Sequence, residues 1–277
     1  MATVVRDGIT LHYAVTGSGA PIVLTHSFLC DGSLFTHQVA ALERNHRVIN
    51  IDLRGHGQSG PSEAAFSVYD LVDDVVTVLD AEGVDSAVWM GLSIGGFLSL
   101  RAALTMPGRV RALVLIDTDA GPESAWNKVK YTSLKWGLQM LGPRFIVPAV
   151  VPLMFGRTTL GSRAELVGEY RERFLNVRVK SACAGVDAIL RRDDLVDRLH
   201  EIRVPTLVVV GEEDRALPPW KAQRIARGIA GSELIVVPRA GHLSAIENPA
   251  PVTDAIVRFL SQLQPQADSS VVAGRGR

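Results

Sequence analysis

The pentapeptide Gly91-Leu92-Ser93-Ile94-Gly95 is the first candidate for chemistry in this sequence. It has the pattern G-x-S-x-G and lies between a strand-like run and an apolar helical run. In that context the serine occupies a cramped turn with its hydroxyl above the edge of a sheet, and the small flanking residues let strand and helix approach closely. The N-terminus of the following helix directs N–H groups toward a developing oxyanion. The pattern predicts a nucleophilic Ser93; the alternative is a glycine-rich turn that contains serine by chance.

A serine hydroxyl is a weak nucleophile until a base takes its proton, and the base in turn needs an orienting carboxylate. His242 follows the last strand-like run, in VPRAGHLSAIENP, and Asp214 follows the preceding run, in VVVGEEDRALPP. The C-terminal ends of parallel strands meet at one edge of a sheet, so Ser93, Asp214 and His242 are expected to converge there. We predict that they form a catalytic triad.

Other titratable residues compete for these roles. Glu212 and Glu213 precede Asp214 in the same turn, and Asp117 follows another strand-like run. We rank Asp214 first because it comes last in its turn. His56, in DLRGHGQSG, is interpreted as a residue that holds a glycine-rich loop.

No cofactor is expected from the remaining patterns. His12, His37, His46 and His200 lack cysteine or carboxylate partners at metal-ligand spacing, so no metal site is predicted. Gly17 and Gly19 lie beyond a hairpin and open no helix, which argues against a dinucleotide site.

Short runs rich in Val, Ile and Leu alternate with helical patterns along much of the chain. A hairpin around Asp7-Gly8 comes first, in TVVRDGITLHYAVTG. The later runs lack strict alternation, which is typical of strands buried on both faces of a parallel sheet. They cover 21–27, 46–55, 86–91, 110–118, 204–214 and 232–242, with helices expected over 67–82, 95–106, 219–229 and 249–263. This rhythm predicts an α/β fold with a mostly parallel sheet.

One segment, 121–202, breaks the rhythm with helical patterns and no clear strand. We interpret it as a helical cap inserted into a core made of residues 1–120 and 203–263. The tail, 264–277, contains Ser, Gly and Arg and is expected to be disordered.

The overall composition excludes several classes of partner. Lys plus Arg and Asp plus Glu number 29 each, so no general attraction to nucleic acid or to an anionic membrane follows from the net charge. The N-terminus has no signal-peptide pattern and no apolar run is long enough to span a bilayer. Cys30 and Cys183 are far apart in sequence and are predicted to be reduced thiols, with a single disulfide between them as the alternative. We expect a cytoplasmic protein without membrane insertion, a monomer or homodimer, acting on a small molecule.

Residues 3 to 263 together resemble the α/β-hydrolase family. Besides the serine pentapeptide, LTHSFLCDGSLF is similar to its oxyanion loop, INIDLRGHGQSG to its D-x-R-G-x-G-x-S turn, and the Asp214 and His242 loops to its acid and base loops. The order Ser, Asp, His also agrees with the family. The resemblance implies an α/β-hydrolase fold, with the N–H groups of Phe28 and Ile94 as the oxyanion hole. One departure is Ser27, where the family usually has glycine; its hydroxyl can line the pocket or its Cβ can shift the Phe28 N–H.

The resemblance is greatest to enol-lactonases and small carboxylesterases. It implies hydrolysis of an ester or lactone through an acyl-enzyme, without a cofactor. Two alternatives use the same triad, a C–C bond hydrolase and a cofactor-free perhydrolase or haloperoxidase. A third alternative is a hydrolase-like ligand receptor with slow turnover.

The substrate pocket is expected to be apolar. Apolar residues of the cap would roof it over the residues that surround the triad. The expected lining is Ser27, Leu29, Trp126, Trp136, Met140, Phe145, Met154, Leu217 and Leu243.

Overall fold

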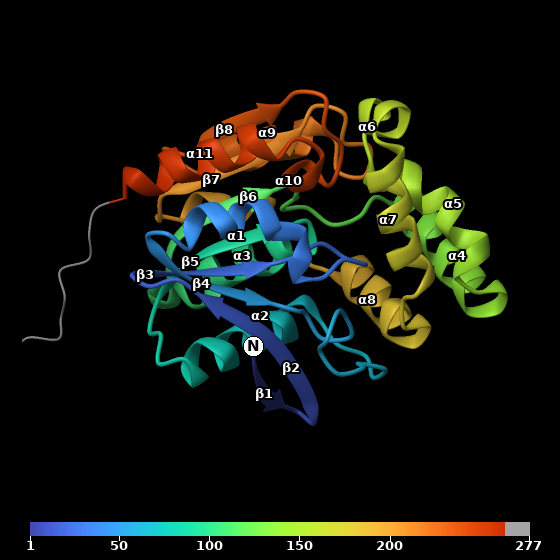
Figure 1. Cartoon of the computed structure of the whole chain (residues 1–277), viewed down its shortest axis with the longest axis horizontal. Coiled ribbons are helices and arrows are strands. Elements are labelled where there is room, and N and C mark those ends of the chain that lie inside the picture. Colours follow the sequence, from blue (N-terminus) through green and yellow to red (C-terminus); the bar gives the residue numbers. More distant parts are fainter. Residues whose placement is uncertain (264–277) are drawn as a thin grey trace, which may run out of the picture.

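The computed structural model describes residues 1–263, so the predicted disordered tail lies outside the described residues. Eight strands form one sheet in the order β1-β2-β4-β3-β5-β6-β7-β8 (Figure 1). The strands β1 and β2 form the predicted hairpin, β2 also pairs antiparallel with β4, and every later pairing is parallel. Their bounds are β1 Ala2–Arg6, β2 Ile9–Thr16, β3 Ala20–Thr25, β4 His46–Ile51, β5 Ala87–Leu92, β6 Val110–Ile116, β7 Thr206–Gly211 and β8 Glu233–Val237.

Both faces of this sheet are buried, which explains the unbroken apolar runs. Successive side chains of a strand point to opposite faces. In β5, Trp89 therefore joins one apolar cluster while Val88 and Met90 join the other. The first cluster includes residues of α2 (Val68–Ala81), α3 (Ile94–Thr105) and α9 (Pro219–Gly228); the second includes residues of α1 (Thr36–Leu42) and α11 (Pro249–Ser261). The predicted α/β class is confirmed.

The helices expected over 67–82, 95–106, 219–229 and 249–263 are present as α2, α3, α9 and α11. The start of α2 is fixed by a capping box, in which the Ser67 side chain accepts from the Asp70 N–H while Asp70 accepts from the Ser67 N–H. Short helical segments were not predicted: α1, α10 (Ser244–Glu247), and the 3₁₀ turns η1 (Gly32–Phe35) and η2 (Pro107–Arg109). Their few residues give too little periodicity for a helical pattern.

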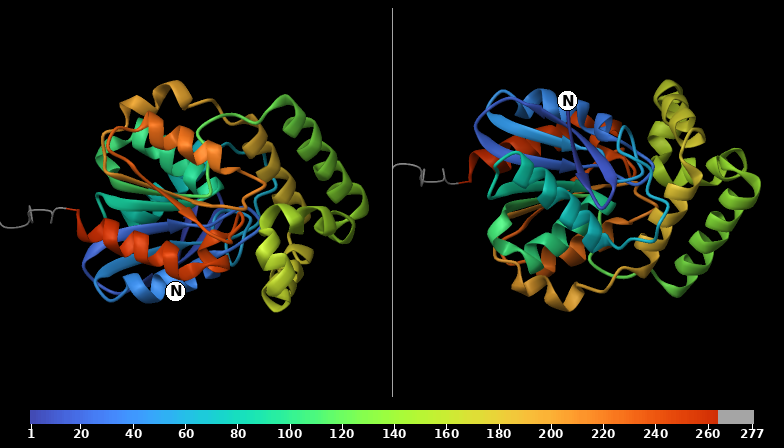
Figure 2. Two further views of the ribbon diagram at one scale, coloured as in Figure 1. Left: turned by 90° about the horizontal axis from the view of Figure 1, so that it is seen from above. Right: turned by 90° about the horizontal axis from the view of Figure 1, so that it is seen from below.

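Five helices lie together beyond one end of the sheet and form the cap (Figure 2). They are α4 (Ala125–Leu141), α5 (Pro143–Met154), α6 (Arg157–Ser162), α7 (Ala164–Leu175) and α8 (Val179–Arg191). Gly137 lets α4 and α5 approach closely, because a Cβ there would lie 2.6 Å from Cδ1 of Ile146. The predicted cap segment ends at residue 202, and its last part, η3 (Val196–Glu201), contributes Leu199 to the core of the sheet.

Candidate active site

Ser93 lies in the sharp turn between β5 and α3. Its backbone has φ 56° and ψ −110°, a conformation that side-chain-bearing residues rarely adopt. The two glycines of the pentapeptide make this turn possible: a Cβ at Gly91 would lie 2.1 Å from the Gly95 backbone, and a Cβ at Gly95 would lie 2.1 Å from the Thr25 carbonyl oxygen. The turn is held in place by Thr118, whose Oγ1 donates to the Ser93 carbonyl at 2.8 Å.

Asp214 and His242 meet beyond the ends of β7 and β8, as the topology predicts. The His242 Nδ1 lies 2.9 Å from Asp214 Oδ2. The other oxygen, Oδ1, accepts from the N–H groups of Ala216 and Leu217 at 2.9 and 2.8 Å. With the carboxylate ionised, Nδ1 is the donor, which leaves Nε2 as the nitrogen able to accept a proton.

The environment of His242 favours the imidazolium. Burial opposes its charge, but the Asp214 carboxylate, by charge and by hydrogen bond, outweighs burial and raises the pKa of His242. The nearby side chains of Asp117 and Glu247 raise the pKa of His242 further, through their negative charge. A ring that readily holds a proton is suited to act as a base.

Ser93 and His242 line the same cavity, which has a volume of about 150 Å³ and is partly open to solvent. The cavity lies between the C-terminal edge of the sheet and the cap. Thus the structure brings the three predicted residues to one place: two through a hydrogen bond, and the serine through the shared cavity.

The loop after β3 contains Phe28, one of the two predicted oxyanion donors. The His26 ring holds this loop, because Nε2 accepts from the Leu53 N–H at 2.9 Å and Nδ1 therefore donates to the Ser27 carbonyl at 2.8 Å. That carbonyl and the Phe28 N–H belong to one trans peptide, so fixing the first fixes the direction of the second. Within residues 1–263, neither the Phe28 N–H nor the Ile94 N–H has a hydrogen-bond acceptor. Both remain available as donors.

The competing carboxylates have other partners. Glu213 accepts from the N–H and hydroxyl of Thr158 in the cap, and Glu212 lies 3.3 Å from the Arg239 N–H. Asp117 accepts from the N–H groups of Gly211 and Ser244, so it ties the ends of neighbouring strands together behind the site. The His56 ring nitrogen Nδ1 lies 3.0 Å from the Arg54 carbonyl and its ring packs against Phe28, in keeping with a role in holding the loop.

Glu247 is a residue that the sequence analysis missed. Its Oε1 accepts from the N–H groups of Gly241 and Leu243, which flank His242, and its Oε2 accepts from the Gly156 N–H in the cap. It therefore holds the histidine loop and joins it to the cap. The only signal in the sequence was a carboxylate five residues after the histidine, which is too common to single out.

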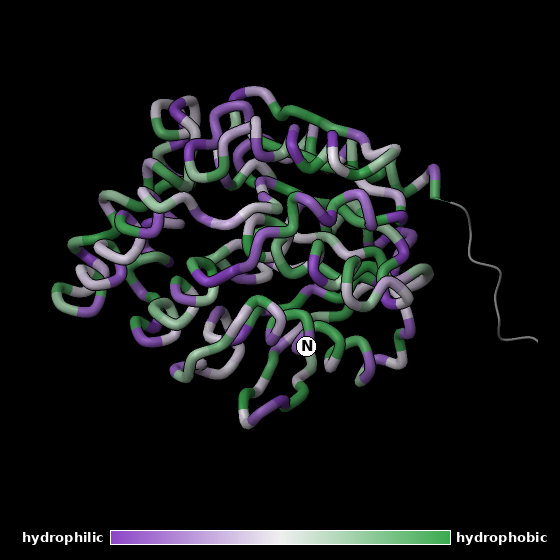
Figure 3. Tube along the Cα trace, turned by 180° about the vertical axis from the view of Figure 1, so that it is seen from behind, coloured by the Kyte–Doolittle hydropathy of each residue, from purple (hydrophilic) through white to green (hydrophobic). Residues whose placement is uncertain are grey.

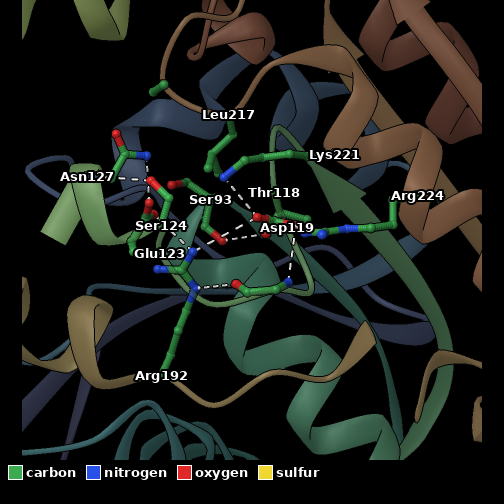
Figure 4. A network of polar contacts seen from close by, with 12 residues as sticks. Ser93, Thr118, Asp119, Glu123, Ser124, Asn127, Arg192, Leu217, Lys221 and Arg224 are labelled. Carbon is green, nitrogen blue, oxygen red and sulfur yellow. Dashed lines mark hydrogen bonds and ion pairs between the residues drawn. The ribbon is translucent and has the colours of Figure 1, made fainter. Parts of the chain in front are cut away.

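A buried ionic network lies next to the serine turn (Figure 4). Asp119 pairs with Lys221 at 2.9 Å and with Arg224 at 2.5 Å, and Arg192 pairs with Glu123 at 2.9 Å. Burial alone would raise the pKa of Asp119, but the Lys221 ammonium and the other donors outweigh it and lower this pKa. Since Thr118 adjoins Asp119, the network fixes the segment that holds Ser93.

The cavity lining is only partly the predicted one. Ser27, Leu29, Met154 and Leu217 line it. Unpredicted lining comes from the inward faces of the cap helices and from α3: Phe97, Tyr131, Leu134, Leu138, Ile146, Val150, Leu153, Val186, Ile189 and Leu190.

Five pocket predictions are wrong. Trp126, Trp136, Met140 and Phe145 are exposed to solvent and do not line the cavity. The reason is that α4 and α5 each carry apolar residues on both faces, so hydrophobicity alone does not reveal which face is inward. Leu243 is fully buried in the core cluster that contains α11, rather than at the cavity.

Residues 1–263 contain no group of three or more His, Cys, Asp or Glu side chains arranged to hold a metal ion. In the same range, no helix has the length and apolarity needed to cross a membrane.

Comparison with known proteins agrees with this architecture. A family model for the alpha/beta hydrolase fold matches residues 20–249. A putative carbamate hydrolase RutD of Variovorax paradoxus is 30% identical over 265 residues, which cover 91% of this chain and 97% of that protein. The 3-oxoadipate enol-lactonase 1 of Acinetobacter baylyi is 25% identical over 261 residues, covering 94% of this chain and 96% of that protein.

Solved structures give the same result. A thermophilic esterase from Thermogutta terrifontis has a TM-score of 0.88 at 31% identity, covering 94% of this chain and 97% of that chain. The enol-lactonase from Burkholderia xenovorans LB400 also has a TM-score of 0.88, at 28% identity, covering 94% of this chain and 100% of that chain. The resemblance inferred from the motifs is confirmed, and the chain belongs to the α/β-hydrolase fold family.

Proposed function

We propose that this chain is a serine hydrolase that cleaves a small carboxylic ester or lactone through an acyl-enzyme. One observation carries the proposal: a serine on a strained turn shares a cavity with a histidine whose other nitrogen is bonded to a buried carboxylate. The esterase and enol-lactonase named above have the same fold at 28–31% identity and thus support this reaction class.

In the proposed reaction the Ser93 Oγ attacks the substrate carbonyl carbon while His242 Nε2 takes the hydroxyl proton. The Phe28 and Ile94 N–H groups stabilise the negative oxygen of the tetrahedral intermediate. The intermediate expels the alcohol, which receives its proton from His242. Water then attacks the acyl-enzyme, its proton passes through His242 to Ser93, and the acid leaves.

The cavity favours an uncharged substrate portion. Most of its lining is aliphatic or aromatic. Its two charged lining residues are already paired: Glu123 with Arg192, and Lys135 with Asp187 at 2.6 Å. A substrate carboxylate placed among these apolar side chains would lose its hydration without gaining an unpaired cation, which costs several kcal/mol. We therefore expect esters with apolar acyl or alcohol groups to be preferred.

Ser93→Ala tests the proposal with p-nitrophenyl butyrate as substrate. Loss of the nucleophile should reduce kcat by about 10⁵–10⁶-fold without unfolding the protein. Ser133→Ala, which removes an exposed hydroxyl from the cap, is the matched control and should keep full activity. A fluorophosphonate should add its mass to the Ser93 peptide of the parent protein. Substantial activity in Ser93→Ala, or labelling of a different residue, would overturn the proposal.

A further inference from the structure

The outward side of the hairpin α4–α5 exposes large apolar side chains. Trp126 is 76% exposed, Trp136 60%, Met140 75% and Phe145 67%. On α4, Trp126, Val129, Trp136 and Met140 follow one another at helical spacing and so share a face. We call this face, together with Leu141 and Phe145, the cap outer face.

The cap outer face is separate from the substrate cavity. Tyr131, Leu134 and Leu138 on the opposite side of α4 line that cavity. Figure 3 shows hydrophobic segments at the outer edge of the cap. Monomeric proteins seldom expose contiguous apolar side chains of this size without a binding role. We therefore expect the cap outer face to bind a partner.

Charge indicates what kind of partner this is. Residues 124–164 contain no Asp or Glu, whereas the chain as a whole has zero net charge. The basic residues of the hairpin are Lys128, Lys130, Lys135 and Arg144. Lys135 pairs with Asp187, but the other three form no ion pair within residues 1–263. The surroundings of the cap outer face are thus locally cationic.

We propose that the cap outer face docks on an anionic lipid surface. Exposed Trp, Phe and Met among Lys and Arg is the combination that binds at the headgroup boundary, since the rings enter the acyl region and the cations contact lipid phosphates. A second copy of the chain fits less well, because a two-fold contact through this face would bring the same unpaired cations together. In this arrangement α4 and α5 lie along the boundary between lipid and water, and neither helix crosses the membrane.

Vesicle binding tests the proposal directly. The full chain should co-sediment with vesicles of equal phosphatidylglycerol and phosphatidylcholine, should bind phosphatidylcholine alone at least tenfold more weakly, and should be released by salt. In Trp220→Phe, the remaining tryptophans are the buried Trp89 and the two of the outer face. A blue shift of its emission with anionic vesicles would place those two rings in the lipid.

Substitutions locate the contact. Trp136→Gln and Phe145→Gln should each weaken vesicle binding at least tenfold, and Lys128→Gln by about fivefold. Trp220→Gln, which removes a ring 54% exposed outside the cap, is the matched control and should bind as the parent does. The proposal fails if anionic vesicles do not bind, or if Trp136→Gln binds them normally. It also fails if sedimentation velocity shows a dimer that Trp136→Gln dissociates, since a second copy would then cover this face.

A separate observation concerns Ser27. Its side chain is fully buried and lines the cavity with Ser93, yet its Oγ has no hydrogen-bond partner in residues 1–263. A buried hydroxyl without a partner destabilises the protein, and a bound molecule in the cavity would supply the missing acceptor.

We infer that the Ser27 hydroxyl donates a hydrogen bond to the reacting carbonyl oxygen of the substrate, beside the Phe28 N–H. This inference rests on the proposed function. The hydrogen bond would strengthen as negative charge develops on that oxygen, so it would act on kcat more than on KM.

Ser27→Ala and Ser27→Gly test this second inference. Both remove the hydroxyl, and Gly also restores the backbone freedom usual at this position, so both should lower kcat by about 10²-fold with KM nearly unchanged. An unchanged kcat in Ser27→Ala, or full recovery in Ser27→Gly, would overturn the role of the hydroxyl while leaving the proposed function intact. Activity in Ser93→Ala would instead overturn the proposed function.

Discussion

The edge of the sheet that carries the candidate site and the cap hold their side chains in different ways. At the edge, Asp214 and Glu247 each bind three partners, and those partners are mostly backbone N–H groups. In the cap, the residues that line the cavity are mostly apolar, and these apolar residues are held by packing. Hydrogen bonds have preferred directions, whereas apolar contacts do not. The edge can therefore fix the positions of reacting groups. Substitution of an apolar lining residue of the cap can change the shape of the cavity without moving those groups.

The largest expected effect comes from breaking the directed contacts at the edge. Asp214→Asn removes the charge that favours the imidazolium and the acceptor that fixes the ring tautomer. We expect kcat to fall by about 10⁴-fold with the fold intact. Steady-state kinetics with p-nitrophenyl butyrate would measure this. A loss below tenfold would mean that Asp214 does not orient His242; Glu212→Gln, in the same turn, is the control.

The next effect concerns the network beneath the edge. Asp119→Ala removes the carboxylate that pairs with the buried Lys221 ammonium. Because a buried charge is then left without its partner, we expect the free energy of unfolding to fall by about 3–5 kcal/mol. The exposed pair of Asp80 with Arg109 gives a comparison, since Asp80→Ala should cost about 1 kcal/mol or less. Urea denaturation measures both. Equal losses would show that burial does not distinguish the two pairs.

The pH dependence of activity should report the raised pKa of His242. The base must be neutral, so kcat/KM should rise with pH and reach half its maximum above pH 6.5, the ordinary histidine value. Below that midpoint it should fall about tenfold per pH unit. Asp214→Asn should move the midpoint down, because it removes the main source of the raised pKa. A parent midpoint below 6.5 would contradict this account of the site.

The smallest effect should come from the cap and should depend on the face that is changed. Val186→Phe fills part of the cavity, so kcat/KM for p-nitrophenyl octanoate should fall about tenfold relative to the acetate. Val129→Phe makes the same change on the outer face and should leave that ratio unchanged. An equal effect of both substitutions would mean that the cavity lining and the cap outer face are not functionally distinct.

The same difference explains what could be predicted from sequence. The strands and the main helices were predicted because each buries an extended apolar pattern, and Ser93, Asp214 and His242 because strand ends of a parallel sheet meet at one edge. The orientation of α4 was not predicted, because residues on both of its faces are apolar. Glu247 was missed because its partners are backbone N–H groups, and their positions depend on the folded loops.

The neutral ring of His26 gives the protein a lower limit to its working pH. Both nitrogens of the ring are engaged, and burial lowers its pKa in the native protein despite the hydrogen bond to Ser27. The unfolded chain therefore takes up a proton more readily, so this contribution to stability is complete above about pH 6.5 and diminishes as acid is added. His26→Asn should flatten the dependence of the urea midpoint on pH between 7 and 5. Acid would thus weaken the loop that orients the Phe28 N–H.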